Sequence, residues 1–121
     1  MAYAKRWNEL RSEDCGILLE HLALDILRVS ASGVRLFFWR DKQKHEIDFV
    51  IQESANKVHA VECKWSSDEF TVKNLAAFRD LYPTGKNFCI VGTAAAPRVE
   101  RKIAGHTVIF VDIQSFTDVL N

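Results

Sequence analysis

The segment "HEIDFVIQESANKVHAVECKW", residues 45–65, decides how this chain folds. β-Branched and aromatic residues dominate its two halves, and the polar stretch "ESANK" (53–57) separates them, which is typical of a β-hairpin. Acidic residues interrupt both apolar runs, since Asp48 stands inside the first and Glu62 inside the second. The segment therefore predicts a hairpin that carries carboxylates in the middle of its strands.

The alternation of side chains along a strand predicts which residues share a face. Glu46, Asp48 and Val50 are expected on one face. Folding the hairpin about the centre of its turn places Asp48 opposite Glu62 and Glu46 opposite Lys64, and a slip of two residues would keep the same faces. Opposed residues have Cβ atoms about 5 Å apart, where like charges destabilise the pair. The other face of the first strand would carry Ile47, Phe49 and Ile51.

Two carboxylates that face each other need a compensating partner. A hard divalent cation such as Mg²⁺ supplies one, because it takes oxygen ligands and often binds one or two carboxylates together with water and phosphate. Lys64 beside the pair would suit phosphoryl chemistry. The alternative is an exposed sheet face with solvated, partly paired charges. Glu20 in "CGILLEHLALDIL" (15–27) also has two interpretations. It is either a solvated residue of a helix or a group that reaches toward a metal.

The rest of the chain predicts one α/β unit. Apolar residues at helical spacing predict a helix over 12–29 with Ser12 as its N-cap and with Leu18, Leu19, Leu22, Ala23, Ile26 and Leu27 in its buried stripe. The expected order is α-β-β-β-α-β-(β)-α, which implies a mixed sheet with helices packed on it. The strands are predicted at 34–40, 46–51, 57–65, 87–93 and 106–113, and the further helices at 68–82 and 113–120.

Composition narrows the class of protein. The chain has 121 residues, which suits a single domain, and a formal net charge of zero, which decides neither for nor against a nucleic acid. No apolar run approaches the roughly 20 residues of a membrane helix, and no signal peptide is recognisable, so we expect a cytoplasmic protein without membrane contact. Cys15, Cys63 and Cys89 form no CxxC pair and are predicted to be buried, reduced thiols.

The ordered set of motifs resembles the PD-(D/E)XK nuclease superfamily. A helix with a glutamate, a strand with an aspartate, a strand with Glu-x-Lys, a helix and an apolar strand follow one another in this family. More closely, "CGILLEHLALDIL", "FFWRDKQKHEIDFVI", "VHAVECKWS" and "GHTVIFVDIQSF" resemble the nuclease-like C-terminal domain of bacterial and archaeal AAA+ type ATPases. The resemblance covers about Gly16 to Leu120. It implies a restriction-endonuclease-like fold over 1–121, either free-standing or as part of a longer ATPase.

The resemblance also implies roles for single residues. Asp48, Glu62 and the backbone carbonyl of Cys63 would hold Mg²⁺ or Mn²⁺, and Lys64 would orient or deprotonate the attacking water. Glu20 would complete the shell of the metal or of the water. The implied activity is hydrolysis of DNA phosphodiester bonds, which makes the chain a candidate Mg²⁺-dependent nuclease.

Some features of the chain depart from the family pattern or have no settled role in it. Ile47 precedes Asp48 where the family name has proline, and the chain contains no GxxxxGK[ST] motif of its own for ATP. Glu46 is expected to pair with Lys64 or to mark a second metal position. Two other functions therefore stay open: a catalytically inactive module for recognition or homodimerisation that works with an ATPase, and a small protein-interaction domain unrelated to nucleases.

Two basic segments are candidates for DNA contacts. "WRDKQKH" (39–45) and "PRVERK" (97–102) are predicted as turns at the rim of the site, where they would meet phosphates or simply be solvated. Trp39 and Trp65 border the acidic strands and are interpreted as packing residues rather than base-stacking ones. The candidate phosphate ligands are Arg40, Lys42, Lys44, Arg98, Arg101 and Lys102.

Overall fold

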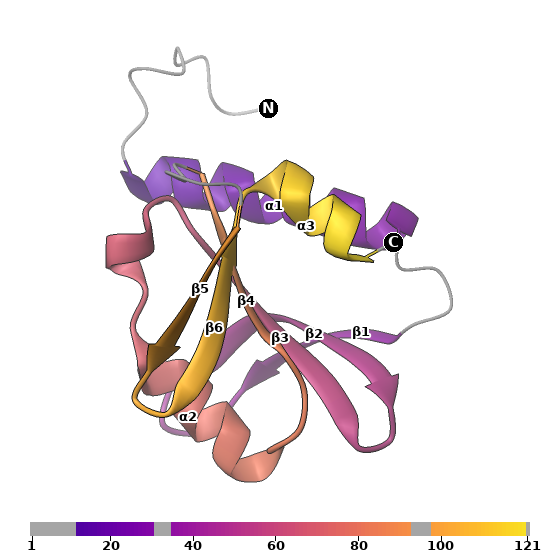
Figure 1. The fold of residues 1–121 in the computed structure, drawn as a ribbon, viewed down its shortest axis with the longest axis vertical. Helices are drawn as coiled ribbons and strands as arrows, with labels where there is room; N and C mark the ends of the chain where they lie inside the picture. The colour runs from indigo at the N-terminus through magenta and orange to yellow at the C-terminus, as the bar shows by residue number, and fades with distance from the viewer. Residues whose placement is uncertain (1–11, 31–34, 93–97, 121) are drawn as a thin grey trace.

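A six-stranded mixed β-sheet forms the centre of the molecule (Figure 1). The computed structural model describes residues 12–30, 35–92 and 98–120, and among them the side chains of 17–28, 35–92 and 98–118. The strand order is β1-β2-β3-β4-β6-β5, with antiparallel pairs at both ends and parallel pairs β3–β4 and β4–β6 between them. The strands are β1 (Arg35–Arg40), β2 (Glu46–Ser54), β3 (Lys57–Lys64), β4 (Asn87–Val91), β5 (Arg98–Ile103) and β6 (His106–Val111).

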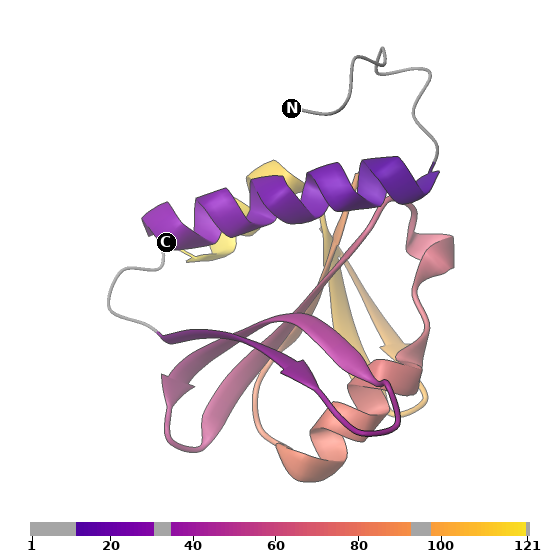
Figure 2. The same cartoon turned by 180° about the vertical axis from the view of Figure 1, so that it is seen from behind.

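Helices cover both faces of this sheet. α1 (Ser12–Ser30) and α3 (Ile113–Leu120) lie together on one face, and α2 (Val72–Leu81) lies on the other (Figures 1 and 2). Each face has its own apolar core, and we call these the α1-side core and the α2-side core. The predicted α/β class, the mixed sheet and the flanking helices are confirmed.

The face of α1 that packs on the sheet is narrower than predicted. Leu19, Ala23 and Leu27, spaced four residues apart, are buried in the α1-side core. Leu22 was predicted in the same stripe, but half of its side chain is exposed (50%). None of the helices described in the structure is long and apolar enough to cross a membrane.

The predicted register of the hairpin is confirmed. Phe49 pairs with Val61 and Ile51 pairs with His59, which is the register obtained by folding the segment about the centre of its turn. The antiparallel pairing changes only at the turn itself, where Ser54 pairs with Lys57.

The predicted alternation of faces along β2 is wrong at one point. Phe37 of β1 pairs with Val50, whereas Trp39 pairs with Ile47, so the single residue between them faces two residues of β2. This is a β-bulge, which inserts one residue and reverses the alternation beyond it. Consequently Ile47 lies in the α2-side core with Val50, while Phe49 remains in the α1-side core.

Two other segments differ from their predictions. The helix predicted over 68–82 begins only at Val72, because a 3₁₀-helix η2 (Ser67–Glu69), closed by a capping box between Ser66 and Glu69, precedes an extended Phe70. The segment 98–102, predicted as a turn, is the edge strand β5. Its charged side chains suit a solvent-exposed edge and conceal the strand pattern in the sequence.

The packing interpretations of the tryptophans and cysteines hold where side chains are described. The Trp39 ring packs edge-on against Phe78, with 5.4 Å between centroids. Trp65 covers Gly92, where a Cβ atom would come within 2.1 Å of the indole ring. Cys63 and Cys89 are buried and free, and burial raises the pKa of both thiols. The side chain of Cys15 lies outside the described residues.

Candidate active site

Asp48 lies at the bulge of β2, where the hairpin ladder ends. Its Oδ2 atom accepts a hydrogen bond of 2.8 Å from the backbone N–H of Cys63. The first pair of the β2–β3 ladder is Phe49 with Val61, so this side-chain bond occupies the next position along the hairpin. One oxygen of Asp48 thereby orients the carboxylate, and the other is left for a further partner.

Glu62 lies in β3, and its side chain is buried (5% exposed). Its neighbours Val61 and Cys63 belong to the α1-side core, so alternation turns Glu62 toward the α2 face. Burial raises the pKa of Glu62 to about 7, and repulsion from the Asp48 carboxylate adds to the effect. Lys64 and the Asn74 side chain lower this pKa without cancelling the rise. At neutral pH the buried carboxyl is therefore only partly ionised.

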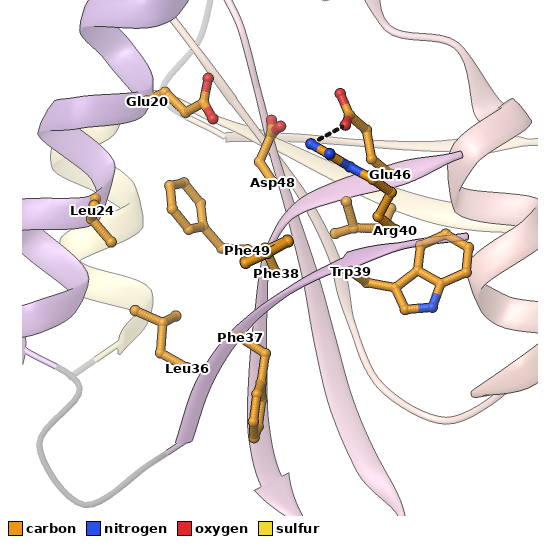
Figure 3. A pocket seen from close by; sticks show the side chains of 11 residues that line it. Glu20, Leu24, Leu36, Phe37, Phe38, Trp39, Arg40, Glu46, Asp48 and Phe49 are labelled. Atoms are coloured by element: carbon orange, nitrogen blue, oxygen red, sulfur yellow. Dashed lines mark ion pairs between the residues drawn. The ribbon is translucent and has the colours of Figure 1, made fainter. Parts of the chain in front are cut away.

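Glu20 on α1 completes the group of acids. Figure 3 shows the carboxylates of Glu20 and Asp48 facing each other between the helix and β2. Burial raises the pKa of Glu20, followed by repulsion from Asp48, while Lys64 lowers it. The pKa of Asp48 is also raised by burial and lowered by the Cys63 N–H and by Lys64. Electrostatic coupling links Glu20 with Asp48, Asp48 with Glu62, and all three with Lys64, and we call these four residues the acidic cluster.

The donor atoms of the acidic cluster suit a divalent cation in their chemistry. Among the described residues, no group of three or more His, Cys, Asp or Glu side chains is placed to hold a metal ion. Asp48 and Glu62 nevertheless supply the hard oxygen donors that Mg²⁺ takes, and Mg²⁺ sites often use one or two carboxylates and keep several waters. Burial is the largest cause of the raised pKa values of Asp48 and Glu62, and Lys64 and the hydrogen bonds to these carboxylates do not cancel it.

Glu46 has a different partner from the one predicted. Its Oε2 atom lies 3.2 Å from Nη2 of Arg40, and the two residues are direct cross-strand neighbours in β1 and β2. The predicted pairing of Glu46 with Lys64 is therefore wrong. The reason is that β1, which the hairpin argument left out, places a cation closer to Glu46 than β3 does.

The first basic segment lies beside the acidic cluster. Arg40 ends β1, and Lys42 and Lys44 are exposed in the turn that leads into β2. Asp41 fixes this turn, because its Oδ1 accepts the backbone N–H groups of Gln43 and His45 at 2.9 Å. The cations are thus presented on an ordered turn.

The second basic segment is separated from the acidic cluster. It forms β5, the edge strand opposite β1, which is three strand spacings from β3 or roughly 14 Å. Arg98 lies 3.4 Å from Glu100, and the guanidinium of Arg101 stacks over the Phe110 ring at 5.1 Å. Lys102 is exposed. The prediction that these residues lie in a turn at the rim of the site is wrong.

Sequence reasoning overlooked a pocket next to the acidic cluster. It has a volume of about 470 Å³ and lies between α1 and β1 (Figure 3). Phe38, with 73% of its side chain exposed, stands at this pocket directly opposite the bulge. The available signal was the pair Phe37–Phe38, since two adjacent aromatic residues on a strand cannot both face the same core.

Comparison with known proteins gives a family and a fold. A family described as "Domain of unknown function (DUF4143)" matches residues 15–113. The chain belongs to this family. No protein with a curated description matches this DUF4143 member.

Four solved chains resemble the structure. One comes from the structure described as "Refined half-complex from tetradecameric assembly of Thermococcus gammatolerans McrB AAA+ hexamers with bound McrC", with a TM-score of 0.66 and 14% sequence identity. The match covers 89% of this chain and 33% of that chain, so the DUF4143 chain spans about a third of its neighbour's length. At this identity the similarity concerns the fold alone.

Proposed function

We propose that this domain hydrolyses DNA phosphodiester bonds with the help of a divalent cation held by Asp48 and Glu62. The observation that carries the proposal is the acidic cluster: the carboxylates of Glu20 and Asp48 face each other (Figure 3), and Asp48, Glu62 and Glu20, all with raised pKa values, are each coupled electrostatically to Lys64. Such a cluster is costly for a domain that has no use for it, because like charges held together in a partly buried site oppose folding.

The residues of the chain have separate tasks in this proposal. Asp48 and Glu62 would hold Mg²⁺ or Mn²⁺, with the backbone carbonyl of Cys63 as a further oxygen donor. When bound, the ion would neutralise the carboxylates and polarise a phosphate oxygen. Lys64 is half-buried beside both acids, where its ammonium group would orient the attacking water and stabilise charge on the phosphate. Glu20 would complete the shell of the ion or of that water.

Cleavage of labelled DNA in Mn²⁺ and calorimetric titration with Mn²⁺ test the proposal together. We expect Asp48→Asn to abolish both cleavage and Mn²⁺ binding, and Lys64→Met to abolish cleavage while Mn²⁺ still binds. Glu100→Gln removes an exposed carboxylate on β5 and should leave both unchanged. A wild-type protein that binds no Mn²⁺, or a Lys64→Met variant that cuts as fast as wild type, would contradict the proposal.

A second candidate is a catalytically inactive module that works with an ATPase. Two observations favour it: among the described residues no group of three or more His, Cys, Asp or Glu side chains is placed to hold a metal ion, and a solved chain of similar fold comes from an assembly of McrB AAA+ hexamers with McrC. For this candidate we expect that the wild-type domain cuts no DNA with Mg²⁺ or Mn²⁺ but binds an AAA+ ATPase in a pull-down with purified components.

A further inference from the structure

The pocket beside the acidic cluster has apolar walls and a charged end. Leu24 of α1, Leu36 of β1 and Phe49 of β2 line it, and the carboxylates of Glu20 and Asp48 stand at its margin (Figure 3). Its volume of about 470 Å³ lies in the range of small-molecule sites and suits a group the size of a nucleoside. A ligand seated here would touch the acidic cluster directly.

Phe38 gives this pocket an exposed aromatic surface. Its 73% exposure is the largest among the big apolar side chains that the structure describes. The register places it opposite Asp48 and Phe49, and its neighbour Arg40 pairs across the strands with Glu46, which lines the same pocket. The site thus offers a stacking surface, a guanidinium group for a phosphate and the carboxylates of Glu20 and Asp48 next to one another.

From this arrangement we infer that the pocket holds an unpaired nucleobase stacked on Phe38, so that the domain acts on single-stranded or unpaired DNA. The inference rests on the function proposed above. A base within a duplex has both faces covered by its neighbours, whereas an unpaired base can stack on an aromatic side chain. An aromatic residue at a phosphodiester site therefore selects strands whose bases are free.

A second copy of the chain fits the same surface less well. β1 is an edge strand, and the competing occupant of its free edge is the β1 strand of a second copy. In the antiparallel pairing that uses the whole strand, however, Arg35 of one copy faces Arg40 of the other at both ends. Like charges in directly opposed positions destabilise such a pair.

The experiment compares two neighbouring phenylalanines. Phe37→Ala is the matched control, because Phe37 borders the same pocket and is also half exposed (48%), but it pairs with Val50 of the α2-side core, and Figure 3 shows its ring pointing away from the carboxylates. Fluorescence anisotropy would measure binding of a labelled single-stranded oligonucleotide and of a blunt hairpin duplex. Ca²⁺ replaces Mg²⁺ in the assay, and a gel verifies that the DNA stays intact.

We expect wild type to bind the single strand at least about tenfold more tightly than the duplex. Phe38→Ala should weaken binding of the single strand by roughly 5- to 150-fold, the range for losing one stacked base, and leave duplex binding within about twofold. Phe38→Trp should retain binding of the single strand, and Phe37→Ala should change neither. Thermal melting of each variant shows that the fold is intact.

Several results would overturn the inference: equal affinity for single strand and duplex, no binding of DNA by wild type, or equal losses in Phe37→Ala and Phe38→Ala. A Phe38→Ala variant that changes only the sedimentation of the free protein would assign the surface to a second copy instead. The two proposals fail separately. If DNA binding depends on Phe38 but no cleavage occurs in Mn²⁺, only the proposed hydrolysis is refuted. If duplex and single strand are cleaved at equal rates and Phe38→Ala has no effect, only the proposed binding of an unpaired base in the pocket is refuted.

Discussion

Glu62 couples the acidic cluster to folding. Its pKa is about 7 in the fold and close to the ordinary value of 4.5 in the unfolded chain. Below pH 4.5 the group is protonated in both states and imposes no penalty. Between pH 4.5 and 7 the unfolded chain releases the proton while the folded domain retains it, so the free energy of unfolding falls as pH rises. Above pH 7 the penalty is complete.

Replacing this acid by its neutral isostere should therefore stabilise the metal-free domain. We expect Glu62→Gln to raise the free energy of unfolding at pH 8 by up to about 3 kcal/mol, and to have little effect at pH 4.5. Urea denaturation in EDTA at several pH values measures the difference between variant and wild type. Glu100→Gln, on the exposed edge strand, should show no such trend. A Glu62→Gln effect that does not grow with pH would mean that the carboxyl is not held at a raised pKa.

At the scale of single residues, sequence patterns predicted the neighbours of the acidic cluster but not their directions. The turn centre gave the register, so Asp48 was placed beside β3 correctly. The bulge at Asp48 and Phe49 has no local sequence signature, because it depends on how β1 pairs with β2. The same pairing decides that Glu46 binds Arg40. Both the bulge and the partner of Glu46 are therefore determined by long-range strand pairing, which cannot be read from a single sequence.

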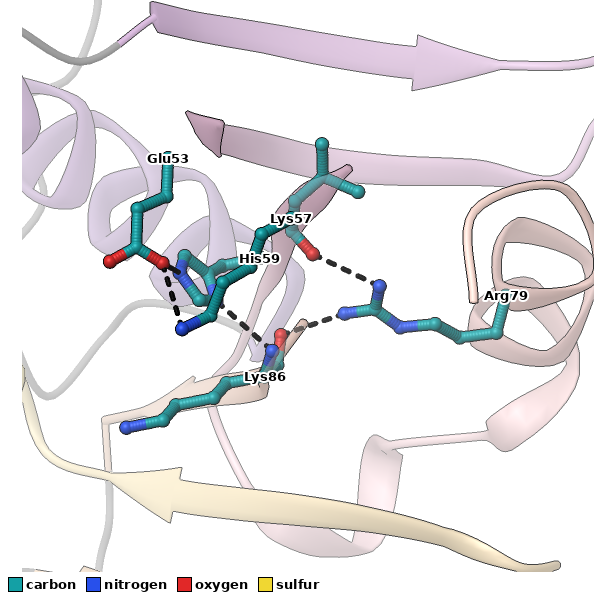
Figure 4. Close-up of polar contacts among 6 residues, drawn as sticks. Glu53, Lys57, His59, Arg79 and Lys86 are labelled. Carbon is teal, nitrogen blue, oxygen red and sulfur yellow. Dashed lines mark hydrogen bonds and ion pairs between the residues drawn. The ribbon is translucent and has the colours of Figure 1, made fainter. Parts of the chain in front are cut away.

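Among the elements, α2 is tied to the sheet by a buried arginine (Figure 4). The Nε–H of Arg79 donates to Oδ1 of Asn87 at 2.7 Å. Its Nη1 donates to the carbonyl oxygens of Val58 and Tyr82 at 3.0 Å, and its Nη2 donates to that of Lys86 at 2.8 Å. Burial lowers the pKa of Arg79 to about 10, so the group stays charged at neutral pH. One guanidinium thus joins the end of α2 to the starts of β3 and β4.

The guanidinium group of Arg79 is planar and holds its N–H donors in fixed directions, so we expect that lysine cannot replace it. Arg79→Lys keeps the charge but loses the paired donors, which leaves buried carbonyl groups without partners. We expect the free energy of unfolding to fall by about 3 kcal/mol, as measured by urea denaturation. Arg98→Lys on the exposed edge strand should change it by less than about 0.5 kcal/mol.

The Mn²⁺ affinity of the folded Arg79→Lys protein should stay unchanged, because Arg79 contacts the end of β3 remote from Glu62 and Lys64. An Arg79→Lys variant as stable as wild type would show that the positive charge alone, and not the set of guanidinium hydrogen bonds, holds the end of α2 to β3 and β4.

Prediction of the elements succeeded where pattern and environment agree. β4 was predicted as a continuously apolar strand and is buried throughout, because it lies between β3 and β6 with helices on both faces. β5 was missed, since an edge strand needs no apolar run and its charges resembled a turn. The start of α2 was placed too early, because the capping box at Ser66 and Glu69 begins a 3₁₀-helix and not the helix itself.

Over the whole molecule, the two basic segments lie at opposite edges of the sheet. The turn with Lys42 and Lys44 adjoins Arg40 and the pocket, whereas β5 with Arg98 and Lys102 lies beyond β4 and β6. On the proposed function, a DNA strand bound at the acidic cluster would therefore meet the first segment and not the second. Sequence alone gave the two segments equal standing, because the strand order that separates them was not predicted.

Neutralising two cations at each edge in turn tests this assignment. Lys42→Gln/Lys44→Gln and Arg98→Gln/Lys102→Gln remove the same net charge, so any difference between them reflects position. For a single-stranded oligonucleotide, losing two phosphate contacts should reduce the slope of log affinity against log salt by about 1.4. We expect this reduction, with weaker binding at low salt, only in the turn pair. Equal effects from both pairs would mean that the DNA crosses the whole width of the sheet, and a larger effect from β5 would move the binding path away from the pocket and Phe38.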